Sequence, residues 1–230
     1  MGWCNRCRKD FSGEEDFCPA CWEKMRAERR SARKELIKKV WAGEPCRTHT
    51  DRGVLEVRIR PPEMFYGATW ETINGSLQEQ IKPFVSGDAG MLTLLGPAGT
   101  GKTWTAWGTT FATIIDHANC HFVDWYDLNR WAMDSRLFGD SGDAGREILY
   151  ALECCDLLVI DEFAVTKLHE AEHTTVLGIN SHRVNHKRRT LLATTKNEAE
   201  IVECVGEAML SRINGGIVIQ MQGKDRRLRP

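Results

Sequence analysis

Short apolar runs recur along the last two thirds of the chain, and amphipathic stretches separate them. The apolar runs show no polar alternation, which is typical of strands that helices cover on both faces. They predict strands at 91–95, 120–125, 156–160, 190–195 and 216–220. The stretches between them predict helices at about 102–117, 127–138, 144–154, 170–187 and 198–212. This alternation predicts an α/β domain built on a five-stranded parallel sheet.

Composition divides the chain into three zones. Residues 1–22 carry four cysteines in two pairs, and residues 23–60 are rich in charge. The strand and helix pattern fills residues 61–230, and Pro61-Pro62 marks its start because two prolines cannot continue a helix. We therefore expect a small metal-binding module, a charged helical linker and one α/β domain.

Overall charge and hydrophobicity limit the classes of function. The 230 residues carry a formal net charge of -1, so any contact with DNA needs a local basic patch. No apolar run reaches the roughly 20 residues that span a bilayer, and residues 1–10 lack the apolar stretch of a secretion signal. These features predict a cytoplasmic protein, and in a reducing compartment clustered cysteines bind metal more often than they form disulfides.

The four N-terminal cysteines follow the pattern C-x2-C-x10-C-x2-C. Each two-residue gap lets a tight turn direct two sulfurs at one ion, and four thiolates suit tetrahedral zinc. A segment of this length buries too little apolar surface to fold alone, so the ion would supply the missing stability. The expected zinc ligands are Cys4, Cys7, Cys18 and Cys21.

A charged helix is predicted directly after these cysteines, over residues 21–43. Leu36, Ile37, Val40 and Trp41 share one stripe, while arginines and lysines occupy the rest of the surface. The pattern suits an ordinary solvated helix. It also suits a docking helix for a partner protein or a patch that contacts the DNA backbone.

A phosphate-binding loop is the strongest motif in the chain. The sequence "GPAGTGKT" at 96–103 matches G-x-x-x-x-G-K-[ST] between a predicted strand and a predicted helix. Glycines let backbone amides surround a phosphate, and the helix N-terminus favours negative charge. Lys102 should reach the β- and γ-phosphates and Thr103 should ligate Mg²⁺. The expected nucleotide contacts are Gly96, Pro97, Ala98, Gly99, Thr100, Gly101, Lys102, Thr103 and Trp104.

The strand in "DLLVIDEF" (156–163) should carry the acidic half of this site. Asp161 is expected to hold the Mg²⁺ shell together with Thr103. Glu162 is expected to position and deprotonate the attacking water, which favours hydrolysis over transfer to a small-molecule acceptor. In "TLLATTKN" (190–197), Asn197, or alternatively Thr195, is expected to contact that water or the γ-phosphate.

The order of these segments resembles the AAA+ ATPases, and within them the DnaC/DnaI-type helicase loaders and the IstB-type transposition ATPases. The resemblance covers about residues 55–230 and rests on "RPPEMFYGATWETI", "GPAGTGKT", "LLVIDEF", "TTKNEAEI" and "GEAMLSRINGGIVIQ". It implies that Arg212 is the arginine finger that completes a neighbouring subunit's site. Because 18 residues follow Arg212, we expect no C-terminal helical lid, as in this branch of the AAA+ proteins.

The resemblance implies an ATPase that delivers a hexameric replicative helicase onto single-stranded DNA. It further implies ATP, Mg²⁺ and Zn²⁺ as cofactors, self-association into a ring or spiral, weak activity as a monomer, and a bacterial or phage origin. The alternatives are an IstB-like ATPase that remodels target DNA for a transposase, a nucleotide-dependent adaptor that hardly hydrolyses ATP, and a small-molecule kinase.

Contacts with single-stranded DNA are expected from "DWYDLNRWAMDSRLF" (124–138), which mixes cationic and aromatic side chains. The candidates are Arg130, Trp131, Arg136 and Phe138. For Trp131 the spacing along the helix favours a place in the core instead.

Overall fold

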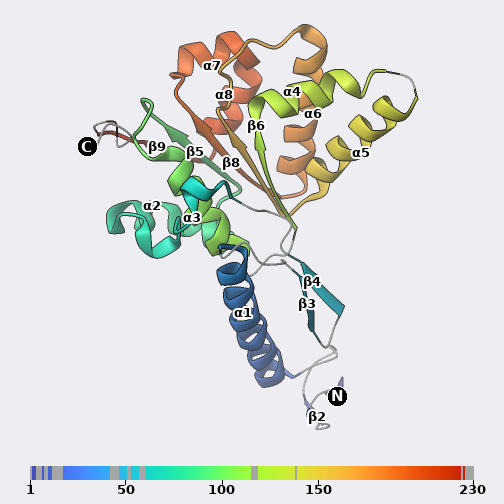
Figure 1. Ribbon diagram of the computed structural model, residues 1–230, viewed down its shortest axis with the longest axis vertical. Helices are drawn as coiled ribbons and strands as arrows, with labels where there is room; N and C mark the ends of the chain where they lie inside the picture. Colours follow the sequence, from blue (N-terminus) through green and yellow to red (C-terminus); the bar gives the residue numbers. More distant parts are fainter. Residues whose placement is uncertain are drawn as a thin grey trace.

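The computed structural model describes residues 2–3, 7, 10–11, 18–41, 47–50, 53–56, 61–114, 119–137, 139–223 and 225. A single parallel sheet forms the centre of the main domain, with helices on both faces (Figure 1). Among the described residues, no helix is both long and apolar enough to cross a membrane.

Five strands form this sheet in the order β6-β7-β8-β5-β9, and every neighbouring pair is parallel. They are β5 (Met91–Leu95), β6 (Cys120–Asp124), β7 (Leu157–Asp161), β8 (Arg189–Thr194) and β9 (Ile217–Gln220). The fold class and the sheet predicted from the apolar runs are therefore confirmed. The order places β8 between the strand that precedes the phosphate-binding loop and the strand that ends in Asp161.

Alternate residues of each central strand enter two separate cores. Leu92 and Leu94 pack with α2 (Gly75–Ser86) and α3 (Lys102–Ile114), whereas Met91 and Leu95 face the other side. The second core is covered by five helices (Figure 1). They are α4 (Trp125–Asp134), α5 (Asp140–Cys154), α6 (Glu170–Asn185), α7 (Glu198–Val205) and α8 (Glu207–Asn214). Burial on both faces explains why these strands are continuously apolar.

One predicted helix is two helices in the structure. The pattern at 198–212 predicts a continuous helix, but α7 ends at Val205 and α8 begins at Glu207. Gly206 between them has φ 81°, which a residue with a side chain rarely adopts. The α7 end is held because His173 Nε2 lies 2.7 Å from the Val205 carbonyl oxygen.

The segment that enters the domain is more ordered than its sequence pattern indicates. Two short 3₁₀ helices, η1 (Glu63–Phe65) and η2 (Trp70–Thr72), precede α2, and none of the three was predicted. Asn74 caps α2 by accepting a hydrogen bond from the Ser76 N–H at 3.0 Å. At the other end of α2, Arg189 of β8 donates to the Val85 carbonyl at 2.9 Å. This contact joins the entry segment to the sheet.

A buried arginine holds α6 against the sheet. Arg183 is fully buried, and burial lowers its pKa. Its guanidinium donates to the carbonyls of Leu152, Cys155 and Arg189, and its Nε donates to the Thr190 hydroxyl at 3.0 Å. These partners lie on or beside α5, β7 and β8, so one side chain fixes three elements at the amino edge of the sheet.

Five further elements precede the main domain. They are β1 (Gly2–Trp3), β2 (Asp10–Phe11), α1 (Pro19–Trp41), β3 (Arg47–Thr50) and β4 (Gly53–Glu56). Strands β1 and β2 pair antiparallel, as do β3 and β4. The long α1 agrees with the helix predicted over 21–43, while the β3-β4 hairpin was not predicted. The division into a module, a linker and an ATPase domain stays a prediction.

Candidate functional site

The phosphate-binding loop connects β5 to α3 at the carboxyl edge of the sheet. Gly96, Gly99 and Gly101 have φ values of 147°, 75° and 95°. Such backbone conformations favour glycine and let successive amides point into one concavity. Thr100 braces the loop by donating to the Pro97 carbonyl at 2.9 Å. The geometry suits an anion at the start of α3.

Lys102 is folded back onto its own loop. Its Nζ donates to the carbonyls of Gly96 at 2.7 Å and Pro97 at 2.8 Å, and the side chain is 8% exposed. The ammonium therefore already stands in the concavity of the loop, close to where a phosphate would add its charge. Pro97 and Ala98, by contrast, are exposed at the rim.

Asp161 meets the first turn of α3 across the edge of the sheet. The Thr103 side chain hydrogen-bonds to the Asp161 carboxylate, and the Glu162 N–H donates to Asp161 Oδ1 at 3.0 Å. Burial raises the pKa of Asp161, while these two hydrogen bonds oppose that rise. A hydroxyl and a carboxylate in contact are hard oxygen donors, so the pair fits Mg²⁺.

Glu162 lies next to this pair but points into solvent. Its φ is 53°, an uncommon conformation for a residue with a side chain, and the residue is exposed. Phe163 then returns to the core and its N–H donates to the Ala193 carbonyl at 2.9 Å. The left-handed backbone at Glu162 thus turns its side chain away from the line of β7. An exposed carboxylate beside the Thr103–Asp161 pair has the freedom to orient a water, as expected for a general base.

A second carboxylate at this edge was not singled out by the sequence. Asp124 ends β6 directly opposite Asp161, and its charge contributes to the raised pKa of Asp161. Its Oδ1 also accepts the Tyr126 N–H at 2.7 Å, so it caps α4. The aspartate that ends "CHFVD" could have predicted this position, because neighbouring parallel strands end at the same edge of a sheet.

Asn197 serves as a helix cap in the structure. Its Oδ1 accepts the Glu200 N–H at 3.0 Å, and Glu200 Oε2 accepts the Asn197 N–H at 2.9 Å. This reciprocal pair starts α7. Thr195 is exposed directly after β8, the strand between β5 and β7. The position of Thr195 therefore suits a contact with a γ-phosphate better, although the role of either residue stays a prediction.

Trp104 points toward the entry segment. Its Nε1 donates to Thr72 Oγ1 at 3.0 Å, and its ring packs against the first core. The contact fixes η2 beside the first turn of α3. The contact of Trp104 with nucleotide that the sequence predicts stays a prediction.

Arg212 lies toward the opposite edge of the sheet from the loop. Gly216, four residues later, approaches Met91 at the start of β5, while the loop begins after Leu95. Five strand residues span about 16 Å. Arg212 therefore lies far from its own loop.

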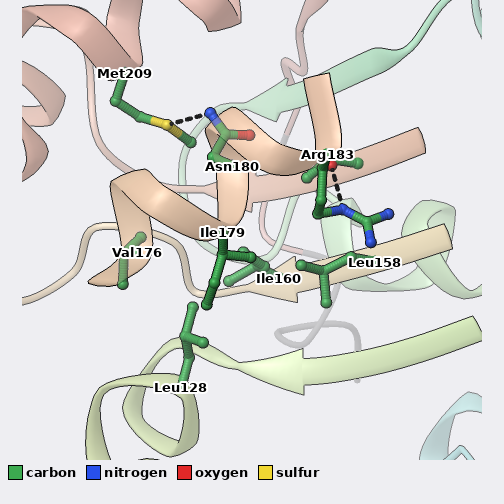
Figure 2. A pocket seen from close by; sticks show the side chains of 9 residues that line it. Leu128, Leu158, Ile160, Val176, Ile179, Asn180, Arg183 and Met209 are labelled. Atoms are coloured by element: carbon green, nitrogen blue, oxygen red, sulfur yellow. Dashed lines mark hydrogen bonds between the residues drawn. The ribbon is translucent and has the colours of Figure 1, made fainter. Parts of the chain in front are cut away.

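The Arg212 side chain rests on α6. It donates to Ser181 Oγ at 2.8 Å and to the Ala208 carbonyl at 2.9 Å. Asn180, the residue before Ser181 on α6, donates through Nδ2 to Met209 Sδ at 2.9 Å, and Met209 lies about one turn before Arg212 on α8 (Figure 2). Helix α6 is thus a platform that positions α8 and its arginine.

A small cavity lies beneath this platform, between α4, α6, α8 and the sheet (Figure 2). Its lining includes Asn180, Arg183 and Met209, and its volume is about 10 Å³. This is close to the least space that one water molecule needs. Asn180 Oδ1 is buried there without a protein partner, which suits a water and leaves no room for a substrate.

Three of the four expected zinc ligands lie together. The Sγ atoms of Cys7, Cys18 and Cys21 are within 4.8 Å of one another, and the Cys7–Cys18 separation is 3.8 Å. Four sulfurs at about 2.3 Å around one zinc are about 3.8 Å apart, so the spacing fits tetrahedral zinc. Cys4 lies outside the described residues.

The expected DNA-contacting residues separate into two groups. Trp131 packs against the second core, as its spacing indicated. Arg130 and Arg136 are exposed, and Arg130 pairs with Asp127 at 3.0 Å. Phe138 lies outside the described residues. The structure adds Tyr126 and Met133, which are exposed and share the α4 face of Arg130 at spacings of four and three residues, and Leu137, which is exposed in the turn after α4.

Comparisons with known proteins agree with this geometry. The family described as IstB-like ATP binding protein matches residues 82–229. The replicative helicase loader DnaC of Escherichia coli K12, like that of Shigella flexneri, is 28% identical over 121 residues, which cover 53% of this chain and 49% of DnaC. The chain thus spans about half the length of the curated relatives it matches.

Solved structures show the same fold. The crystal structure of a DnaC helicase loader has a TM-score of 0.60 at 20% identity and covers 70% of this chain and all of that one. DnaI has a TM-score of 0.59 at 16% identity, covering 73% and 94%. The initiator DnaA bound to AMPPCP and single-stranded DNA has a TM-score of 0.60 at 17% identity, covering 69% and 50%. The fold is that of the AAA+ domains of these proteins.

The charge of Asp161 should lower the stability of the metal-free protein, although Mg²⁺ binding needs that charge. Replacing Asp161 with Asn removes a half-buried negative charge, so the metal-free protein should gain about 1 kcal/mol in free energy of unfolding. The same change should abolish Mg²⁺-dependent ATP hydrolysis. Urea unfolding in EDTA and a phosphate-release assay measure the two effects. An exposed control, Asp88→Asn, should change neither, and a destabilised D161N protein would contradict the prediction.

Proposed function

The chain belongs to the family of IstB-like ATP binding proteins, and we propose that it is a helicase loader that hydrolyses ATP at sites shared between subunits. The observation that carries this proposal is the division of the machinery between two edges of the sheet. Thr103, Asp161 and Glu162 stand at the carboxyl edge, while Arg212 stands toward the amino edge on α8. One subunit then holds the nucleotide and its neighbour supplies the positive charge.

Each residue of the site has a separate task in hydrolysis. The loop amides and Lys102 hold the phosphates. Thr103 and Asp161 would hold Mg²⁺, which neutralises charge that develops on the transferred phosphoryl group. Glu162 orients the attacking water and accepts its proton. Arg212 of a neighbour stabilises the charge on the γ-phosphate, a contribution worth several orders of magnitude in rate.

The likeness to DnaC favours a helicase as the partner, since DnaC is named a replicative helicase loader. Single-stranded DNA is the proposed second ligand, because the similar DnaA structure holds it and because α4 carries an exposed stripe. This stripe consists of Tyr126, Arg130 and Met133. An aromatic ring for stacking and a cation for the backbone are the features that grip a single strand.

A second candidate is an ATPase that acts on duplex DNA for a transposase. The family match favours it, because the matching family is named for IstB. The two functions differ in the DNA they should prefer. A stacking stripe distinguishes single strands from duplex, whereas a backbone patch alone does not.

A mixing experiment tests the shared site. Lys102→Ala and Arg212→Ala should each be almost inactive alone with single-stranded DNA present, because one lacks phosphate binding and the other lacks the finger. Mixed in equal amounts they should regain roughly a quarter of wild-type turnover, since one interface in four pairs an intact pocket with an intact finger. Lys82→Ala, an exposed change on α2, serves as the control. Wild-type turnover by Arg212→Ala alone would refute the shared site.

A binding series separates the loader from the transposition ATPase. Replacing both Tyr126 and Arg130 with alanine should weaken binding of an oligo-dT strand about tenfold, with little change for duplex. Fluorescence anisotropy across a salt series measures both ligands. Tyr150→Ala is the matched control, because this tyrosine is 67% exposed but lies on α5 near the amino edge. Tighter binding of duplex than of single strand by the wild type would favour the second candidate.

The cysteine module is proposed to bind one zinc ion and, with α1, to engage the helicase. Zinc would supply folding free energy by joining the segment before α1 to its first turn. Cys18→Ser should lose the metal, measured by elemental analysis of the purified chain, and should no longer capture the cognate helicase. Basal ATP hydrolysis should remain. Cys204→Ser, outside the cluster, should keep both metal and helicase binding. Helicase capture after complete removal of zinc would contradict the proposal.

A further inference from the structure

The segment after β9 runs beside the phosphate-binding loop. Met221 extends the pairing of β9 with β5, because its N–H donates to the Leu95 carbonyl at 2.7 Å. The approach is so close at Gly96 that an added Cβ would lie 2.2 Å from the Met221 carbonyl oxygen. The first glycine of the loop is thus required by this segment as well as by the turn.

A carboxylate of the same segment rests on the middle of the loop. A Cβ added at Gly99 would lie 1.8 Å from Asp225 Oδ1 and 2.8 Å from Asp225 Cα. Only a glycine leaves space for this approach. Asp225 is half-buried, and it also interacts with another part of the protein. A negative charge therefore stands against a loop whose geometry is built to receive an anion.

We propose that Asp225 is a residue of the nucleotide site that sets its affinity for phosphate, because its carboxylate lies on Gly99 and opposes the charge of a bound nucleotide. This inference rests on the proposed function, in that the loop must hold a nucleotide. A phosphate held by the loop amides lies within about 8 Å of a group packed on the loop, which is inside the screening length at 0.1 M salt. Like charges at that distance repel.

The repulsion gives the site a graded response to nucleotide charge. Each further phosphate adds negative charge near the loop, so the penalty is larger for ATP than for ADP unless Mg²⁺ neutralises the difference. The carboxylate thereby makes firm ATP binding depend on the metal pair Thr103–Asp161. It also favours release of nucleotide when the metal leaves.

The test is equilibrium binding of ATP, ADP and inorganic pyrophosphate, in EDTA, by competition with a fluorescent nucleotide. Asp225→Asn should bind all three more tightly, by about tenfold for ATP at low salt and by less for ADP. Asp225→Ala should behave the same way, and Asp225→Glu should keep the wild-type affinity. At 1 M salt the gap between Asp225→Asn and the wild type should close, because salt screens the repulsion.

A matched control removes a different surface charge. Glu79→Gln on α2, where Glu79 is 74% exposed, should leave all three affinities unchanged. Equal or weaker binding by Asp225→Asn and Asp225→Ala overturns the inference, and so does a gain that salt does not reduce. If nucleotide binds the wild type and both variants equally, the proposed function stands while the role of Asp225 falls. If none of the proteins binds nucleotide, both fall.

Discussion

The contact between Thr103 and Asp161 is the interaction on which the rest of the site depends. It joins the first turn of α3 to the end of β7, two positions that are 58 residues apart in sequence and separated by β8 in the sheet. The contact is possible only because parallel strands deliver their carboxyl ends to one edge. The two cores on either side of the sheet hold these strand ends in place, and partial burial makes the Asp161 carboxylate costly to leave without a cation.

Much of this edge was predictable from sequence because its signals are local. The loop glycines, the apolar strand before Asp161 and the turn residue Glu162 each stand beside the element that positions them, so spacing alone placed them. The five strands were predicted for the same reason, since burial on both faces leaves an unbroken apolar run. The contacts that cross the domain were not predictable. From the sequence, Arg183 is an ordinary basic residue on α6, yet it is buried among carbonyls of α5, of the connection before β7 and of β8.

The errors have physical causes of the same kind. Helical periodicity continues through 198–212, but Gly206 adopts a left-handed conformation and divides the stretch, because the contact of His173 with Val205 ends α7 there. The capping role of Asn197 was not predicted either, because it depends on a glutamate three residues later. The entry segment lacks a clear period, and its order comes from tertiary partners such as Trp104 and Arg189. Hydrophobic periodicity indicates which residues of one element are buried. It does not indicate which side chains of other elements contact them.

The two edges of the sheet divide stability from regulation. At the amino edge, Arg183 satisfies the ends of several elements, so this edge is rigid and suits a platform for α8 and Arg212. At the carboxyl edge, the surroundings of the charged groups change when nucleotide and metal bind. There Lys102 is folded on its own loop and Asp161 is half-buried. Under the proposed function, an arginine presented from this rigid edge to the responsive edge of a neighbour would make assembly and catalysis a single requirement. A subunit without a neighbour would then retain every group that holds nucleotide and lack only the cation that stabilises its reaction.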